Sequence, residues 1–437
     1  MSKEYFYAGR WDDHVPGTEG AAGVVVMPAG LPREALARRK FGNPKLEEQQ
    51  PLFPLDEPRR LLDPQVYLAT LDPEKCKKTC TRLVSYRWFA KSDKEQYDSS
   101  QLSQAKWQQK MREQVTELWN PPQNDTLSIQ RVVRDVLADQ TQFQCEALIL
   151  PSPLTINPSS TYSVELEWMD QGLAHAAAAA PATPALVTVA ISDRCLVGLP
   201  PDENALLDTI ADQVTARAPA GVYLVLEQAY EQGYYSSEDD TIASIFRLIS
   251  LFRAGGVRRV MLSYCGVLGF AGLCLGADAW VSGWYKGERR LQLRDLEDDD
   301  NRRAHSAYYS HPFASEINVA KDLPYLAQEG LIEPFLDETA ASRDLVRALR
   351  TKGAAIPADW RATSVKSARA HFNQVAIRET ARISDLPDDE SRVKYAKAWL
   401  ANATKLALSL RDYKDRNDRT EIAHQRRWRE AFTESAG

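Results

Sequence analysis

The stretch LVTVAISDRCLVGLPPDENALLDTIADQVTARAPAGVYLVLEQ (186–228) decides the predicted fold. It begins and ends with runs that are apolar throughout, which is typical of strands covered on both faces in a parallel sheet. Between the runs, Leu207, Ile210 and Val214 fall on one stripe of a helix. The stretch therefore predicts a strand, a helix and a second strand parallel to the first.

The same pattern extends over much of the chain. A second amphipathic helix is predicted over TIASIFRLISLFRAGG (241–256), where two glycines favour a helix end. Seven apolar runs are strand candidates: GVVVMP (23–28), VYLATL (66–71), ALILPS (147–152), LVTVAIS (186–192), VYLVLEQ (222–228), RVMLSYC (259–265) and AWVSGW (279–284). We expect an α/β fold, a (β/α)8-like parallel barrel with one strand still to be found, and keep an open doubly wound sheet as the alternative.

The flanking regions differ from this core in composition. Residues 1–65 are predicted to be an irregular region with the first strand, and the proline-rich, charged part at 44–64 to be an extended surface connection. The barrel is assigned to 66–300, with a helical insertion at about 73–145. Residues 301–437 are expected to form a C-terminal helical region without strands.

Composition excludes several classes of protein. Of the 437 residues, 44% are hydrophobic and 26% charged, which is typical of a folded globular chain. The net charge of −6 gives no overall attraction to nucleic acid or to an anionic membrane. No run of about 18 apolar residues and no hydrophobic signal segment is visible, so we expect a cytoplasmic protein that does not bind membranes.

The six cysteines are spread too thinly for a disulfide scaffold. Cys76 and Cys80 would share a helix face, but no second Cys or His pair with suitable spacing completes a zinc site. Ordinary thiols and no metal are therefore the favoured prediction, and the sequence identifies no cofactor.

Candidate catalytic residues follow the predicted strands, because ligands of parallel α/β folds bind where the strands end. Glu227 ends a strongly apolar strand, so burial is expected to raise its pKa towards that of an acid or base, unless a nearby Lys or Arg pairs with it. Asp72 and Asp193 are candidates for the same chemistry, with helix capping as the alternative.

The segment WYKGERRLQLRD (284–295) follows the last predicted strand and combines basic with aromatic residues. Lys286, Arg289 and Arg290 are predicted to bind a phosphate. Trp284 or Tyr285 is predicted to stack on a base. The alternative is that the arginines pair with the acidic run at 296–300.

The segment at 267–275 is apolar on all sides, which is unusual for the outer helix of a barrel. The chain's own C-terminal helices are the favoured cover, and a protein partner or a second copy of the chain is the alternative.

GADAWVSGWYKGERR (276–290) resembles the last barrel strand of tRNA-guanine transglycosylases, and FYAGRWDDHVPG (6–17) resembles the start of relatives that insert deazaguanines into DNA. The resemblance implies a barrel that acts on a nucleic-acid base. The family's nucleophilic Asp falls at Val281, and its cysteine-rich zinc segment has no counterpart here, which implies a diverged or purely binding role.

We therefore expect a barrel that binds a phosphate-bearing ligand, a nucleotide or a nucleic-acid base, and serves either as a binder or as a diverged base-modifying or glycosyl-transferring enzyme. The alternative is a non-catalytic interaction or scaffold subunit of a protein complex, which would use 267–275 and the C-terminal helices. The sequence does not decide whether the protein is an enzyme.

Overall fold

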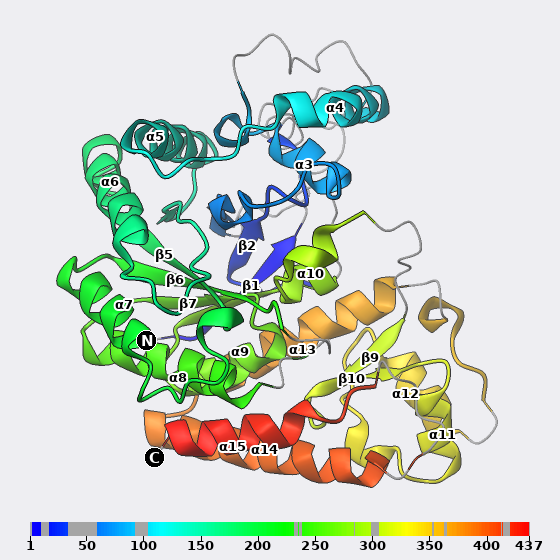
Figure 1. Cartoon of the computed structure of the whole chain (residues 1–437). Coiled ribbons are helices and arrows are strands. Elements are labelled where there is room, and N and C mark those ends of the chain that lie inside the picture. The colour runs from blue at the N-terminus through cyan, green and yellow to red at the C-terminus, as the bar shows by residue number, and fades with distance from the viewer. Residues whose placement is uncertain are drawn as a thin grey trace.

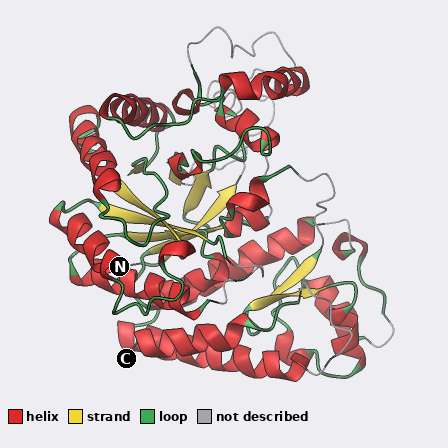
Figure 2. Ribbon diagram, in the orientation of Figure 1, coloured by secondary structure: helices red, strands yellow, loops and turns green. Residues whose placement is uncertain are grey.

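Figure 1 shows the computed structural model of the chain. It describes residues 2–9, 17–33, 59–91, 104–230, 235, 238–283, 285–298, 306–351, 354–361, 365–411, 413 and 420–436, with backbone only for 104–108 and 286. The strands of the main sheet lie at the centre with helices around them, and a separate strand pair lies in the C-terminal part (Figure 2).

Eight parallel strands form the central sheet, in the order β3-β2-β1-β8-β7-β6-β5-β4. They are β1 (Glu4–Gly9), β2 (Gly23–Val26), β3 (Arg59–Leu62), β4 (Leu148–Ile149), β5 (Ala185–Ser192), β6 (Gly221–Glu227), β7 (Val260–Ser263) and β8 (Ala279–Ser282). The strand residues are buried, as expected for strands covered on both faces. The exceptions are Arg59 and Arg60 of β3 and the first residues of β1 and β5, which are half-buried.

The two edge strands of this sheet, β3 and β4, meet and nearly close it into a barrel. The Glu146 backbone N–H donates to the Arg60 carbonyl oxygen at 3.0 Å. The Gln140 side-chain amide donates to the carbonyl oxygens of Leu62 and Ile149, one from each edge strand, at 3.2 and 2.7 Å. The predicted (β/α)8-like barrel is therefore confirmed, and the open doubly wound alternative is wrong.

Two strands of the barrel, β1 and β3, were not among those predicted. In β3, Arg59 and Arg60 precede the two leucines, so only half of the strand is apolar. Arg59 is accommodated because its guanidinium pairs with Glu4 at 2.6 Å and with Glu146 at 3.3 Å. Both strands lie before residue 66, so the barrel begins close to the N-terminus.

The strand predicted at 66–71 is wrong. Val66–Leu68 form the 3₁₀ helix η1, because Gln65 takes a left-handed conformation (φ 52°) that turns the chain directly after β3. The run is apolar because all three residues of η1 are buried, which periodicity cannot distinguish from a strand.

Helices fill the connections between strands and cover the barrel. Those up to residue 300 are α3 (Lys77–Leu83), α4 (Gln104–Leu118), α5 (Thr126–Gln142), α6 (Ser163–Ala179), α7 (Ala205–Ala216), α8 (Asp239–Ala254), α9 (Gly269–Cys274) and α10 (Lys286–Arg289). Further 3₁₀ turns are η2 (Arg87–Phe89), η4 (Asp193–Cys195), η5 (Gly266–Leu268), η6 (Leu293–Leu296), η7 (Glu333–Phe335) and η8 (Ala358–Trp360). Of the helices that the structure describes, none is both long and apolar enough to cross a bilayer.

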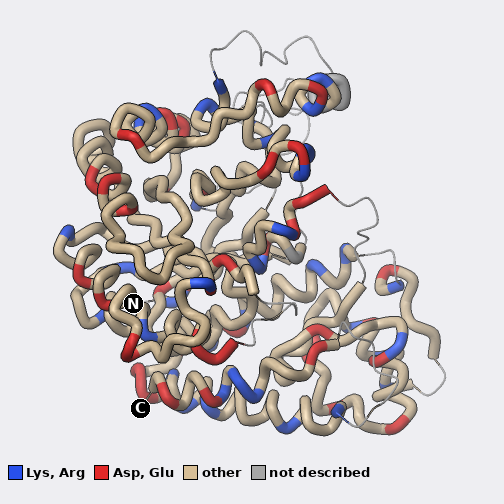
Figure 3. The backbone as a smooth tube through the Cα atoms, in the orientation of Figure 1, with Lys and Arg blue, Asp and Glu red and all other residues tan. Residues whose placement is uncertain are grey.

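The C-terminal third adds a helical layer beside the barrel (Figure 1). It comprises α11 (Asp322–Gln328), α12 (Arg343–Arg350), α13 (Lys366–Ser384), α14 (Asp389–Arg411) and α15 (His424–Ser435). Acidic and basic residues are interspersed along α14 and α15 (Figure 3). The prediction that no strand follows residue 300 is wrong, because β9 (Ala307–Ser310) and β10 (Ser315–Asn318) form an antiparallel pair that is too short to give a clear alternating pattern.

The apolar segment at 267–275 is covered by the chain itself, as favoured from the sequence. Helix α9 contacts both α13 and α14. Its Phe270 ring packs edge-on against Trp399 of α14, with 5.9 Å between ring centres. Most residues of the segment are buried within the chain, so the structure does not support its alternative use as a partner surface.

We predict that Gly269→Ala destabilises the fold by about 1–3 kcal/mol, because an added Cβ would lie 2.5 Å from the Trp280 ring and overpack the core. Urea unfolding followed by tryptophan fluorescence measures this change. Gly287→Ala is the control, since a Cβ there meets no atom within 4 Å. Equal unfolding midpoints for the two variants would contradict the packing described.

Candidate functional site

A pocket of about 160 Å³ opens at the C-terminal ends of the barrel strands. The residues that line it follow β1, β2, β3, β7 and β8, or lie on α3: Gly9, Met27, Ala29, Gly30, Gln65, Leu68, Thr79, Arg82, Tyr264, Tyr285, Gly287, Glu288, Arg290, Leu291, Gln292, Asp295 and Leu296. Barrel proteins bind their ligands at this end, because loops from several strands converge there. We call this set of residues the mouth pocket.

Gln65 and Tyr264 approach the mouth pocket from two different strands and contact each other. The Gln65 side-chain amide donates to the Tyr264 hydroxyl at 2.7 Å and accepts from the Ala29 backbone N–H at 2.6 Å. Both residues have a positive φ, 52° for Gln65 and 60° for Tyr264. This backbone conformation is unfavourable for residues other than glycine. Its presence in two neighbouring pocket residues is typical of functional sites.

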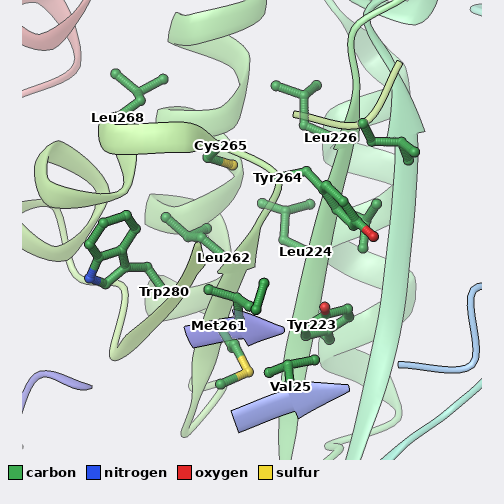
Figure 4. Packing of buried hydrophobic residues seen from close by; sticks show 14 of the residues in the cluster. Val25, Tyr223, Leu224, Leu226, Met261, Leu262, Tyr264, Cys265, Leu268 and Trp280 are labelled. Atoms are coloured by element: carbon green, nitrogen blue, oxygen red, sulfur yellow. The ribbon is translucent and has the colours of Figure 1, made fainter. Parts of the chain in front are cut away.

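A buried carboxyl group, Asp63, lies directly after β3 beneath these two residues. Its Oδ2 accepts hydrogen bonds from the hydroxyls of Tyr67 at 2.5 Å and Tyr223 at 2.9 Å, and its Oδ1 accepts from the Gln65 backbone N–H at 3.0 Å. The Tyr67 and Tyr264 hydroxyl oxygens are 3.4 Å apart. Hydroxyl groups therefore link Asp63 to the mouth pocket; Tyr223 and Tyr264 are visible among the packed apolar side chains in Figure 4.

The electrostatics of Asp63 suit proton transfer. Burial raises the pKa of its carboxyl to about 6, and the hydrogen bonds from Tyr67, Gln65 and Tyr223 limit the rise. A carboxyl with a pKa near neutrality can give or take a proton under ordinary conditions. Burial also raises the pKa of Tyr264, which therefore stays protonated.

The chain after β8 forms a partial roof over the barrel mouth. The Leu291 carbonyl accepts from the Gln228 N–H at 2.8 Å, and the Gln292 side chain donates to the Gln228 carbonyl at 3.0 Å. Because Gln228 follows β6, these bonds carry the roof from β8 to the end of β6. A backbone β-bridge between Arg290 and Cys265 also joins the roof to the end of β7. The mouth pocket lies between this roof and the loops after β1, β2 and β3.

Glu227 and Asp193 lie together at the ends of β6 and β5 but do not line the mouth pocket. Glu227 is buried and accepts a hydrogen bond from Ser192 Oγ at 2.5 Å. Burial raises its pKa, the bond from Ser192 lowers it, and the nearby Asp193 charge adds to the rise. Asp193 accepts from the backbone N–H groups of Ala229 and Tyr230 at 2.9 and 3.0 Å, so it anchors the loop after β6.

Asp72 does not join these two carboxylates. It is exposed in the turn before α3, where its Oδ1 accepts the Glu74 N–H at 2.9 Å. Of the two partners predicted for Glu227, Asp193 therefore lies beside it and Asp72 does not, and the catalytic roles stay predictions. Asp72 stabilises a turn and does not cap α3, whose N-cap residue is Cys76.

The two arginines predicted to hold a phosphate both pair with carboxylates. Arg289 is buried, pairs with Glu316 at 2.8 Å and lies over the Phe372 ring at 3.9 Å. Arg290 is buried and pairs with Asp295 at 2.8 Å. The two arginines thus pair with carboxylates outside the acidic run at 296–300, and their predicted phosphate contact stays a prediction.

Three further predicted residues belong to the same segment. Tyr285 lines the mouth pocket and is about one third exposed. Lys286 is the first residue of α10, and its side chain lies outside the described part of the structure, as does the whole of Trp284. Of the predicted base-stacking pair, the structure thus places Tyr285 at the pocket.

In the segment 276–290, which resembles tRNA-guanine transglycosylases, the structure gives Asp278 a structural role. Asp278 accepts from the Val260 N–H at 2.8 Å and pairs with Arg253 at 3.2 Å, which fixes the start of β8. Val281 is buried within β8. In the second stretch, residues 10–16 lie outside the described residues.

The sequence did not identify Asp63 or Gln65 because both follow the unrecognised strand β3. The signal that could have found Asp63 is its place between two leucines and Pro64, where a strand ends. Tyr264 does follow a predicted strand, so its position, although not its role, could be inferred.

The described residues contain no group of three or more His, Cys, Asp or Glu side chains placed to hold a metal ion. Cys76 and Cys80 are both buried, and burial raises the pKa of the Cys76 thiol to about 11. Thiols in this state are poor metal ligands and poor nucleophiles.

Fold and site together define the class of the protein: an α/β barrel with a small polar pocket at the carboxyl ends of its strands. No protein-family model matches the chain, and no curated protein matches it either.

We predict that Asp63 contributes a pH-dependent stability. Its folded-state pKa lies above its unfolded value, so folding is favoured more as the pH falls through 6, and this gain is lost as the pH rises again. Relative to Asp63→Asn, the free energy of unfolding of the wild type should therefore rise by about 2 kcal/mol between pH 8 and pH 4.5.

Urea unfolding at the two pH values tests this shift, with Asp344→Asn on the exposed surface of α12 as the control. A difference between wild type and Asp63→Asn that is the same at both pH values would show that the carboxyl is not perturbed.

Proposed function

We propose that the protein binds a ring-sized polar ligand, the base of a nucleoside or nucleotide, in the mouth pocket. The volume of about 160 Å³ is close to the ~150 Å³ of a cavity that accommodates one benzene ring, and is below the ~300 Å³ at which pockets for larger ligands begin. Met27 and Leu68 supply apolar contacts for a ring, and Tyr285 offers an aromatic face at the rim.

The observation that carries the proposal is the strained pair Gln65 and Tyr264. Their amide and hydroxyl groups are fixed by each other in the mouth pocket. Fixed donors and acceptors in an otherwise small cavity select a ligand by its own pattern of hydrogen-bonding groups. A nucleobase has such a pattern along its edges.

In the enzymatic form of this proposal, Asp63 is the final proton acceptor. The ligand gives a proton to Tyr264, Tyr264 gives its own to Tyr67, and Tyr67 gives its own to Asp63, so that one proton leaves the ligand and both tyrosines end neutral. Such a step suits a diverged base-modifying or glycosyl-transferring enzyme, in which a ring nitrogen loses or gains a proton. A protein that only binds the ligand needs only the contact between the ligand and the Tyr264 hydroxyl.

Several expectations from the sequence stay predictions. They are the relationship to tRNA-guanine transglycosylases, a cytoplasmic location, and binding of a protein partner or second copy through the C-terminal helices. The scaffold alternative loses one of its two supports, because segment 267–275 is covered by α13 and α14.

We predict that Tyr264→Phe weakens nucleoside binding about threefold to tenfold, because it removes one hydrogen-bonding hydroxyl and leaves the ring in place. Isothermal titration calorimetry with adenosine, guanosine, cytidine and uridine measures the affinities.

Tyr230→Phe is the matched control, since Tyr230 lies in the loop after β6 with 58% of its surface exposed. The proposal fails if the wild type binds none of the four nucleosides, or if Tyr264→Phe binds them as tightly as the control variant does.

A further inference from the structure

Arg369, on α13, is a buried cation that no carboxylate of the described chain neutralises. The residue is 6% exposed, and its Nε has no hydrogen-bond partner. The other buried arginines near the barrel mouth differ: Arg289 pairs with Glu316 and Arg290 with Asp295. An unpaired buried guanidinium is costly, so proteins keep one chiefly where an anion completes the pairing.

Arg369 lies beside Tyr285, a residue that lines the mouth pocket, but is not itself among the lining residues. Its guanidinium carbon is 5.3 Å from the centre of the Tyr285 ring, and Tyr285 lines the pocket. Tyr5, whose hydroxyl donates to the Ser282 carbonyl at the end of β8 at 3.0 Å, is close enough to Arg369 for the charge to influence its pKa. Burial raises the pKa of Tyr5, and the charges of Arg289 and Arg369 oppose the rise.

Helix α13 holds Arg369 in this place. It packs against β1 and α9, and Asn373, one turn after Arg369, accepts a hydrogen bond from the Tyr5 hydroxyl at 3.0 Å. The packing of the helix therefore places the guanidinium against the Tyr285 ring, without an ion pair to a described carboxylate. A planar guanidinium placed in this way can donate two parallel hydrogen bonds to an oxyanion such as phosphate.

We propose that Arg369 and Tyr285 form a phosphate subsite beside the mouth pocket, so that the ligand is a nucleoside monophosphate rather than a free base or nucleoside. This inference rests on the proposed function, because the base occupies the pocket while the phosphate reaches past Tyr285 to Arg369. It transfers the phosphate contact first predicted for Arg289 and Arg290 to a residue of the C-terminal layer.

The first test is thermal unfolding of the full chain in inorganic phosphate and in sodium chloride of equal ionic strength. Phosphate should raise the melting temperature of the wild type by a few degrees, because it binds the folded state only. Arg369→Gln should lose this rise. In chloride, Arg369→Gln should melt at the same temperature as the wild type or higher, since it removes an unpaired buried charge.

Arg217→Gln is the matched control, because Arg217 pairs with Asp170 on the outer helices and should keep the phosphate response. A lower melting temperature of Arg369→Gln in chloride would show that Arg369 has a structural role, and an unchanged phosphate response in this variant would overturn the subsite.

The second test compares each nucleoside with its 5′-monophosphate by calorimetry. The wild type should bind the monophosphate about tenfold or more tightly than the nucleoside, and Arg369→Gln should bind the two alike with nucleoside affinity unchanged. If nucleosides bind but the ratio is the same in both proteins, the subsite is wrong and the proposed function stands. If phosphate protects through Arg369 while no nucleoside binds, the base pocket is wrong and the anion site stands.

Discussion

The structure depends on the seam where β3 meets β4. These two strands are the edges of the sheet, and a handful of hydrogen bonds closes it: the Glu146 N–H to Arg60, and the Gln140 side chain to carbonyls on both strands. An unpaired edge would leave backbone groups without partners inside the helical layer. Closure also fixes the position of Asp63, the first residue after β3, inside the barrel.

From Asp63, hydrogen bonds join elements that are far apart in the sequence. Tyr67 belongs to the turn after β3 and Tyr223 to β6, and both donate to the same carboxylate oxygen. Tyr264, at the end of β7, joins through Gln65. Gln65 and Tyr264 therefore belong both to this network and to the lining of the mouth pocket, and both have the strained positive-φ conformation.

Much of the fold could be predicted from the sequence because continuous apolar strands and amphipathic helices carry strong periodic signals, as in β5, α7 and β6. The site could not, for two physical reasons. Strand β3 is half charged, and its Arg59 is accommodated by pairing with Glu4 and Glu146, which no local pattern reveals. Arg369 lies 87 residues beyond Ser282, the last residue of β8, and only tertiary packing brings it to Tyr285.

Polar residues at strand ends predicted the end of the barrel at which the mouth pocket lies, but not which side chains line the pocket. Glu227 and Asp193 do lie at that end, where Ser192 and the loop after β6 occupy their oxygens. Burial alone therefore does not distinguish a reactive carboxylate from a structural one. The hydrogen-bond partners of the carboxylate oxygens make this distinction.

The central claim is that the Asp63 carboxylate bonds to Tyr223 across the barrel interior, and a double-mutant cycle measures this contact most directly. Asp63→Asn, Tyr223→Phe and the double variant would be unfolded in urea at pH 8, where the carboxyl is ionised. We expect a coupling energy of about 1 kcal/mol or more. Additive effects within ~0.5 kcal/mol would contradict it, because they would mean that the two residues do not interact in the folded protein.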